Sequence, residues 1–137
     1  MGRKLEELDP KVQAAAQAAK DECKALGLDF VVTCTYRSGE EQSALYAQGR
    51  TKPGLIVTNA KAGQSFHQFR VALDLYPIVN GKPDLNGVAL KTWKAVAAVF
   101  KKYGFEWAWE WKSFREMPHF QMTGGHPLAY FQAGGKL

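Results

Sequence analysis

Apolar positions recur at helical spacing in two segments of the chain. The first stripe consists of Val12, Ala16, Ala19, Cys23 and Leu26, and the second consists of Leu90, Trp93, Val96, Ala97 and Phe100. Steps of three and four residues place each set on one helix face. Asp9 before Pro10 favours a helix start, because aspartate can cap free amide groups and proline fits the first turn. We therefore expect helices over residues 10–26 and 90–103, ended by Gly27 and Gly104.

Four segments have the composition of strands. Residues 30–37 (FVVTCTYR) and 71–79 (VALDLYPIV) are β-branched and aromatic, residues 105–111 (FEWAWEW) alternate, and residues 118–122 (PHFQM) can form a further strand. Ser38 can cap a short helix over residues 39–49, and residues 50–65 read as a long loop. The turn-rich residues 80–87 leave open a hairpin or a helix start. This mixture predicts an α+β fold, with a small antiparallel sheet flanked by helices.

The length and composition are those of an ordinary globular protein. A chain of 137 residues, 46% hydrophobic and 23% charged, suits one domain over residues 1–137, and no linker or repeat divides it. No apolar run approaches the roughly 20 residues of a membrane span, and the charged N-terminus lacks a signal-peptide core. We therefore expect synthesis in the cytoplasm without a signal peptide, and a monomer.

Charge and cysteine content narrow the classes of partner and cofactor. The net charge of +5 is spread along the chain and would suit nucleic acid or an anionic cell envelope. The sequence contains no nucleic-acid-binding motif, so we expect no nucleic-acid partner. Cys23 and Cys34 lack CxxC or zinc-finger spacing, so we expect both to be buried, reduced thiols.

Four residues carry candidate chemistry. Asp74 lies between two leucines of a predicted strand, where burial without a partner would cost several kcal/mol. A metal ion or an arginine would explain it, unless the side chain lies on the solvent face. His67 precedes it by seven residues, and His119 begins a second strand after a proline. Two histidines and one aspartate form a zinc ligand set that leaves a position for water, with Glu116 as the natural base. His126 reads as a surface or supporting residue.

These residues resemble the signature of the zinc D-Ala-D-Ala carboxypeptidases and related phage endolysins, the VanY-like peptidases of family M15. The pattern S-x-H-x-x-G-x-A-x-D corresponds to residues 65–74 (SFHQFRVALD), and E-x-P-H-F corresponds to residues 116–120 (EMPHF). Residues 35–42 (TYRSGEEQ) resemble the family's strand-end arginine and following helix, and residues 104–111 resemble its tryptophan-rich segment. The resemblance covers about residues 28–122, most of the chain.

The resemblance implies one zinc ion per chain, held by His67, Asp74 and His119 in a site like that of hedgehog-type and D-Ala-D-Ala-peptidase domains. It also implies Glu116 as the general base and Arg37 as the group that binds or polarises the substrate carbonyl. The further substrate-binding residues that it implies are Ser65, Gln42 and Trp109.

The sequence departs from the family pattern at two places. Arg70 stands where the family has glycine, so a positive φ there would strain it, and its charge could reach the cleft. Residues 107–111 (WAWEW) stand where relatives often have glycines followed by Asp-Trp, which affects the substrate-facing wall but not the metal site.

The implied activity is that of a phage-type endolysin, which hydrolyses a peptidoglycan stem-peptide bond by Glu116-assisted attack of zinc-bound water. The first expectation is an L-Ala–D-Glu endopeptidase without a separate wall-binding module, released to the cell wall through a holin. The alternative within the family is a D,D- or L,D-carboxypeptidase. From a different class, a non-catalytic metal- or wall-binding module is disfavoured by Glu116, because a binder needs no base.

Overall fold

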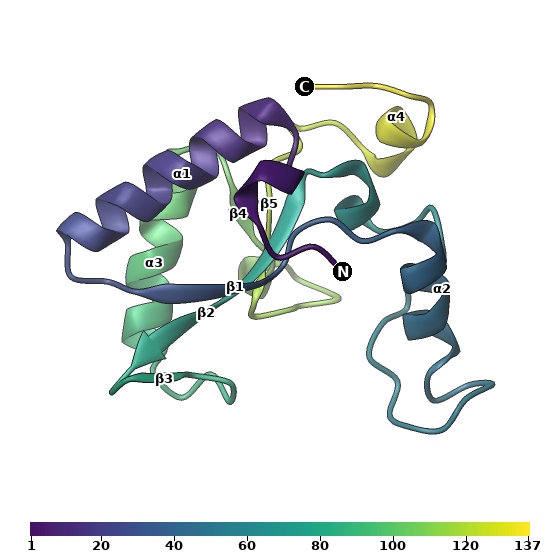
Figure 1. Ribbon diagram of the computed structural model, residues 1–137, viewed down its shortest axis with the longest axis horizontal. Helices are drawn as coiled ribbons and strands as arrows, with labels where there is room; N and C mark the ends of the chain where they lie inside the picture. Colours follow the sequence, from purple (N-terminus) through teal and green to yellow (C-terminus); the bar gives the residue numbers. More distant parts are fainter.

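Five short strands form one antiparallel sheet at the centre of the protein (Figure 1). The computed structural model describes residues 1–137 and confirms the α+β fold. The strands are β1 (Phe30–Cys34), β2 (Ala72–Val79), β3 (Lys82–Pro83), β4 (Glu106–Trp107) and β5 (His119–Gln121), in the order β1-β2-β5-β4 with β3 paired to β2. The helices are α1 (Pro10–Ala25), α2 (Gly39–Ala47), α3 (Leu90–Lys102) and α4 (Leu128–Gln132), and 3-10 turns form η1 (Leu5–Glu7), η2 (Phe66–Phe69) and η3 (Ala108–Glu110).

Helices α1 and α3 supply the helical side of the hydrophobic core. Their buried side chains form one cluster with Leu73 and Leu75 of β2 and Phe120 of β5. Asp9 caps α1 as expected, because its carboxylate accepts a hydrogen bond of 2.9 Å from the amide of Lys11. The two helical stripes read from the sequence are confirmed for their inner residues, whereas Leu26 and Leu90 at their ends are exposed. None of the helices is long and apolar enough to cross a lipid bilayer.

Side-chain alternation along β2 and β5 separates the core from a polar face. Leu73 and Leu75 are fully buried in the core, so Asp74 between them points to the opposite side of the sheet. Phe120 is buried in the core in the same way, and its neighbours His119 and Gln121 share the face of Asp74. The polar candidates of both strands therefore project away from α1 and α3.

Helix α2 and the loop after it form a lobe that stands apart from the body (Figure 1). A capping box begins α2, since Ser38 Oγ accepts from the Glu41 amide and the Glu41 carboxylate accepts from the Ser38 amide. Two side chains that follow α2 also bind the loop. Gln48 donates to the carbonyl of Leu55, and Arg50 donates to that of Thr58. The long loop expected over residues 50–65 is thus held at several points.

The structure corrects two strand boundaries expected from the sequence, settles the 80–87 segment and adds two elements. The strand expected over residues 105–111 is only β4, because the buried Trp107 indole donates to the Met117 carbonyl at 2.6 Å and the chain then turns into η3. β1 ends at Cys34, three residues earlier than expected. The 80–87 segment begins with a hairpin, in which β3 pairs with β2. η2 and α4 were not expected from the sequence.

Arg70 has the left-handed backbone that the family glycine would favour, with φ 63° and ψ 27° at the end of η2. A residue with a side chain is strained there. Its guanidinium lies 3.9 Å from the centre of the Tyr36 ring, and Nη1 donates to the Glu7 carbonyl at 2.9 Å. The Arg70 side chain therefore faces the N-terminal segment and adds no charge to the site described below.

Candidate active site

Three side chains of the site come from neighbouring strands at paired positions. Asp74 on β2 pairs with His119 on β5 and with Cys34 on β1. Residues paired across antiparallel strands project from the same face. A register irregularity between Val32 and Cys34 brings Cys34 opposite Asp74. The sheet itself therefore assembles a row of cysteine, carboxylate and imidazole.

His67 joins this row from η2. The hydroxyl of Ser65 caps η2 by accepting a hydrogen bond from the His67 amide at 3.3 Å. The imidazole is nearly fully buried, and its Nε2 lies 3.2 Å from Asp74 Oδ1. His119 Nδ1 lies 3.4 Å from the same carboxylate oxygen. The aspartate oxygen thus lies between two imidazole nitrogens, as the sequence pattern predicted.

In each histidine, the ring nitrogen that does not face Asp74 (the outer nitrogen) lies within hydrogen-bonding distance of a neutral acceptor. His67 Nδ1 lies 2.9 Å from the carbonyl of Thr35, which can only accept, so this nitrogen carries the hydrogen. His119 Nε2 lies 2.9 Å from Gln121 Oε1. His119 Nδ1 is buried and makes no hydrogen bond. A buried nitrogen lone pair beside a carboxylate suits a divalent cation, so the residues fit the zinc that the sequence pattern implied.

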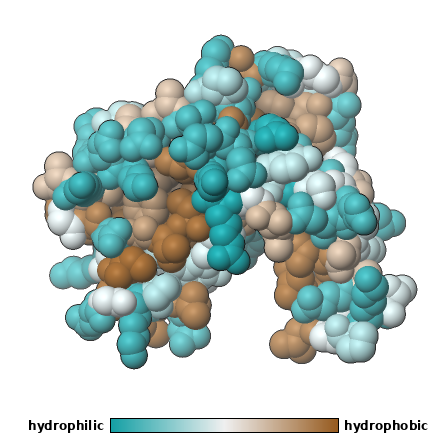
Figure 2. All heavy atoms as spheres, in the orientation of Figure 1, coloured by the Kyte–Doolittle hydropathy of each residue, from teal (hydrophilic) through white to brown (hydrophobic).

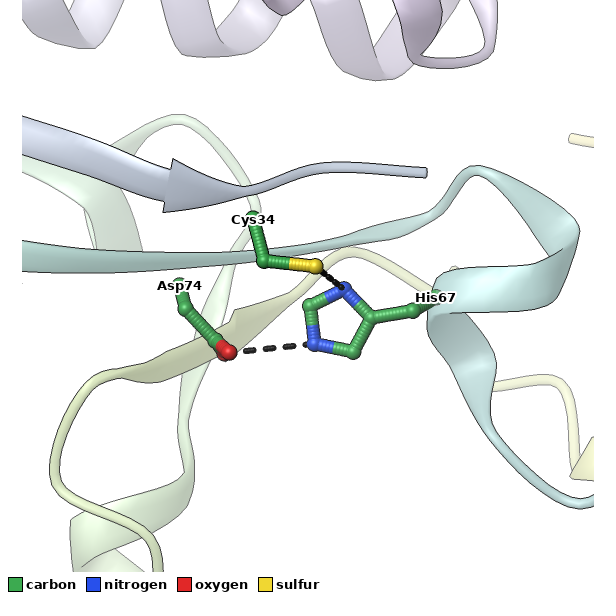
Figure 3. A group of neighbouring side chains, drawn as sticks. All are labelled: Cys34, His67 and Asp74. Carbon is green, nitrogen blue, oxygen red and sulfur yellow. Dashed lines mark hydrogen bonds and ion pairs between the residues drawn. The ribbon is translucent and has the colours of Figure 1, made fainter. Parts of the chain in front are cut away.

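Cys34 gives a second possible donor set with His67 and Asp74. The ligand atoms of these three residues lie within 4.8 Å of one another. Figure 3 shows that the thiol and the carboxylate contact opposite ends of the imidazole, with Sγ 3.6 Å from Nδ1. The two ring nitrogens of His67 point in different directions. A cation bound to Nε2 would therefore be close to Asp74 and His119, and not to the thiol of Cys34. Cys34 is buried and free, as expected, but the sequence did not reveal its place in the site.

Glu116 and Arg37 both border the cluster. Glu116 precedes β5, is about half exposed, and places Oε2 3.7 Å from His119 Nδ1. Arg37 Nη2 lies 3.8 Å from Asp74 Oδ2, and its Nη1 donates to Gln42 Oε1 at 2.9 Å. Gln42 is fully buried and also donates to a carbonyl of the loop after α2. Gln42 thus orients Arg37 and anchors that loop.

The cluster forms the floor of a cleft of about 880 Å³ between the body and the α2 lobe. Figure 2 shows the hollow and the apolar side chains on the inner side of the lobe. Trp111 lines this cleft, with its ring centre 5.8 Å from that of His119. Trp109, expected in the substrate wall, packs against the core and the Arg115 guanidinium instead. The tryptophan that borders the site is therefore the one that sequence reasoning did not single out.

The metal-free site is an ion pair. Burial opposes a charge on the imidazole, but the hydrogen bonds and charges of Asp74 and Cys34 outweigh it and raise the pKa of His67 to about 10. Burial also opposes ionisation of Asp74, yet the two histidines hold the pKa of that carboxyl well below its usual range. At neutral pH the metal-free protein therefore has an imidazolium at His67 beside an ionised Asp74.

Comparison with known proteins identifies the family. Residues 58–122, which include His67, Asp74, Glu116 and His119, match the M15 peptidase model described as D-alanyl-D-alanine carboxypeptidase. Over 123 residues the chain is 38% identical to the peptidoglycan L-alanyl-D-glutamate endopeptidase CwlK of Bacillus subtilis (strain 168), which covers 85% of this chain and 74% of CwlK. The chain belongs to peptidase family M15. It is therefore an enzyme, as expected.

Other proteins resemble the chain at lower sequence identity. The L-alanyl-D-glutamate peptidase of Listeria phage A118 is 26% identical over 119 residues, which span 87% of this chain and 39% of the phage protein. Among solved structures, the Serratia marcescens L-Ala D-Glu endopeptidase ChiX has a TM-score of 0.64 at 20% identity, covering 87% of this chain and 83% of ChiX. A mutant of the vancomycin resistance D,D-pentapeptidase VanY in complex with Zn(II) also has a TM-score of 0.64, at 17% identity, covering 92% of this chain and 78% of VanY. These two structures confirm the expected D-Ala-D-Ala-peptidase-like fold.

Proposed function

We propose that this M15 peptidase is a zinc-dependent peptidoglycan endopeptidase that cleaves the L-Ala–D-Glu bond of the stem peptide. The observation that carries the proposal is the convergence of His67 Nε2 and His119 Nδ1 on one oxygen of Asp74, with Glu116 at the edge of the same cluster. The choice of bond rests on the 38% identity to CwlK, whose name states that activity.

The three residues His67, Asp74 and His119 would hold one zinc ion per chain. Bound zinc would polarise the scissile carbonyl and lower the pKa of a coordinated water. Three protein ligands leave room for water and substrate, as in other catalytic zinc sites. The Zn(II) complex of the structurally similar VanY supports the choice of metal.

Glu116 and Arg37 would carry out the proton transfer and charge stabilisation. Glu116 is exposed enough to meet a substrate in the cleft, so its carboxylate can accept the proton of the attacking water and deliver it to the leaving amine. Arg37, held by Gln42, points its guanidinium into the same cleft and can stabilise the developing oxyanion. Ser65 positions His67 through its amide, so its contribution would be indirect.

The biological setting that we infer is lysis of a bacterial wall by a phage-type enzyme. The phage relative supports this role, and the net charge of +5 would favour an anionic wall. Release through a holin and a monomeric state are part of the same proposal. A carboxypeptidase is the second candidate, because the matching family model bears that description and VanY is named a D,D-pentapeptidase.

Digestion of purified muropeptides followed by mass spectrometry tests the scissile bond. An L-Ala–D-Glu endopeptidase leaves a fragment that ends in L-Ala and a peptide that begins with D-Glu. A D,D- or L,D-carboxypeptidase releases free D-alanine and leaves the rest of the stem intact. Loss of the observed peptidase activity on chelation, and its recovery with zinc, would establish the metal requirement. Activity that resists chelation would contradict it.

Zinc uptake by the metal-free protein is expected to release a proton at neutral pH. The pKa of His67 is raised to about 10, so Nε2 must lose its hydrogen before it binds a cation. Apparent zinc affinity should therefore weaken about tenfold for each pH unit below that pKa, per proton displaced. Calorimetry in buffers of different ionisation enthalpy measures the number released. A binding enthalpy that does not depend on the buffer would contradict the assignment of Nε2 as a ligand.

A further inference from the structure

Gln121 lies between His119 and the edge strand β4, on the same face of β5 as the candidate ligand. Its Oε1 is 2.9 Å from His119 Nε2, and the side chain is buried. On the other side, its Nε2 donates to a carboxylate oxygen of Glu106, the residue paired with it on β4, at 3.5 Å. The amide therefore spans the distance between a buried imidazole and a carboxylate.

The carboxylate of Glu106 determines which way the amide of Gln121 is turned. A carboxylate only accepts hydrogen bonds, so the NH2 group of Gln121 must face Glu106 and its carbonyl oxygen must face His119. A carbonyl oxygen also only accepts, so His119 Nε2 must carry the hydrogen. The lone pair of the neutral imidazole is then on Nδ1, the buried atom that has no hydrogen-bond partner and lies 3.4 Å from Asp74.

We propose that Gln121, oriented by Glu106, is a positioning residue that holds His119 in the tautomer whose Nδ1 can bind the metal. The proposal rests on the zinc site of the proposed function. His67 needs no such side chain, because a backbone carbonyl fixes its outer nitrogen. His119 depends on a replaceable side chain, so the metal affinity of the site can be changed through Gln121, which lines the cleft but is not one of the three candidate ligands.

Metal affinity and the tautomer of His119 test this role directly. Gln121→Leu removes the acceptor at similar volume and is expected to weaken zinc binding about 10- to 100-fold, measured by competition with a fluorescent chelator. In the metal-free wild-type protein, at a pH where the His119 ring is neutral, nitrogen-15 NMR should show its single hydrogen on Nε2. Finding it on Nδ1, or wild-type zinc affinity in Gln121→Leu, would overturn the proposal.

An exchange of the two side chains separates positioning from packing. In the double variant Glu106→Gln with Gln121→Glu, the new carboxylate accepts from His119 and the new amide donates to it, with the same net charge. Zinc affinity within about threefold of wild type is expected, since the carboxylate is at least as good an acceptor. If the double variant binds zinc as weakly as Gln121→Leu, then Gln121 acts by packing alone and the proposal fails.

Thr123→Val provides the matched control, because Thr123 donates to the same Glu106 carboxylate but does not touch His119. It should keep wild-type zinc affinity, and a loss as large as that of Gln121→Leu would point to a general effect on the sheet edge. Melting in excess chelator reports whether each variant folds. The wild-type protein separates the two hypotheses. If it binds no zinc, the proposed function is contradicted. If it binds zinc and Gln121→Leu binds it equally well, only the role of Gln121 is contradicted.

Discussion

Glu116→Gln is expected to lower kcat/KM on cross-linked wall fragments by about 10³-fold while the zinc content stays at that of the wild type. A positioned general base contributes roughly 10²- to 10⁴-fold to such a reaction. Glutamine keeps the shape of the side chain but cannot accept the proton of the attacking water. Glu116 is about half exposed and is neither a core residue nor one of the three candidate ligands, so a glutamine of the same shape should leave both in place. Turnover and metal content of the same preparation give the result.

Glu110→Gln is the matched control for that variant. Glu110 is also about half exposed, but it pairs with Lys101 outside the cleft. A surface pair of this kind contributes little to stability, so the control should keep wild-type turnover. Turnover of Glu116→Gln within tenfold of wild type would remove Glu116 from the role of base. Loss of zinc together with turnover would instead assign the glutamate to the metal.

The two long helices could be predicted because several signals in the sequence agree. In α1 the spacing of apolar residues, the Asp9 cap, the proline at the first position and Gly27 all indicate the same boundaries, and the structure confirms them. The segment 105–111 carries only one signal, the alternation of aromatic residues. That pattern is equally compatible with the observed path, in which Trp107 is buried against the core and the chain then turns into η3. Which tryptophan borders the cleft depends on this turn.

The sequence predicted which residues form the candidate site, but it did not predict how they are arranged. His67, Asp74, Glu116 and His119 stand out by type and order, and the structure brings them into one cluster. The contacts that surround them depend on strand pairing, which one sequence does not specify. Cys34 reaches the cluster only through the register irregularity of β1. Gln121 had a signal, because residues two apart on a strand share a face, so it was bound to lie beside His119.

Asp74→Ala is expected to abolish the stabilisation that zinc gives to the wild-type protein. Zinc at 100 times its Kd would add about 2.7 kcal/mol to the unfolding free energy of the wild type. For a domain of 137 residues this corresponds to a rise in Tm of about 10 °C. Asp74 is the only anion among the three ligands and contacts both imidazoles, so its removal takes away the centre of the site.

The metal-free Asp74→Ala protein should also lose stability, in a manner that depends on pH. The folded state lowers the pKa of Asp74 and raises that of His67 to about 10, so the pair stabilises the fold most between the ordinary pKa values of about 4 and 6.5. This contribution falls as the pH drops below that range, and it fades as the pH rises toward 10. The difference in unfolding free energy between wild type and variant, measured with urea in chelator, should therefore be largest near pH 5 to 6.

His126→Ala serves as the control for zinc-dependent melting. His126 stacks on Tyr130 at a ring-centre distance of 3.8 Å and takes no part in the cluster. Its removal costs an exposed stacking contact but leaves the zinc-dependent rise in Tm unchanged. A zinc-dependent rise in Tm of wild-type size in Asp74→Ala would exclude Asp74 as a ligand. The metal would then have to bind on the side of the His67 ring that faces Cys34. A rise that disappears in Asp74→Ala and persists in His126→Ala locates the metal at the carboxylate between the two histidines.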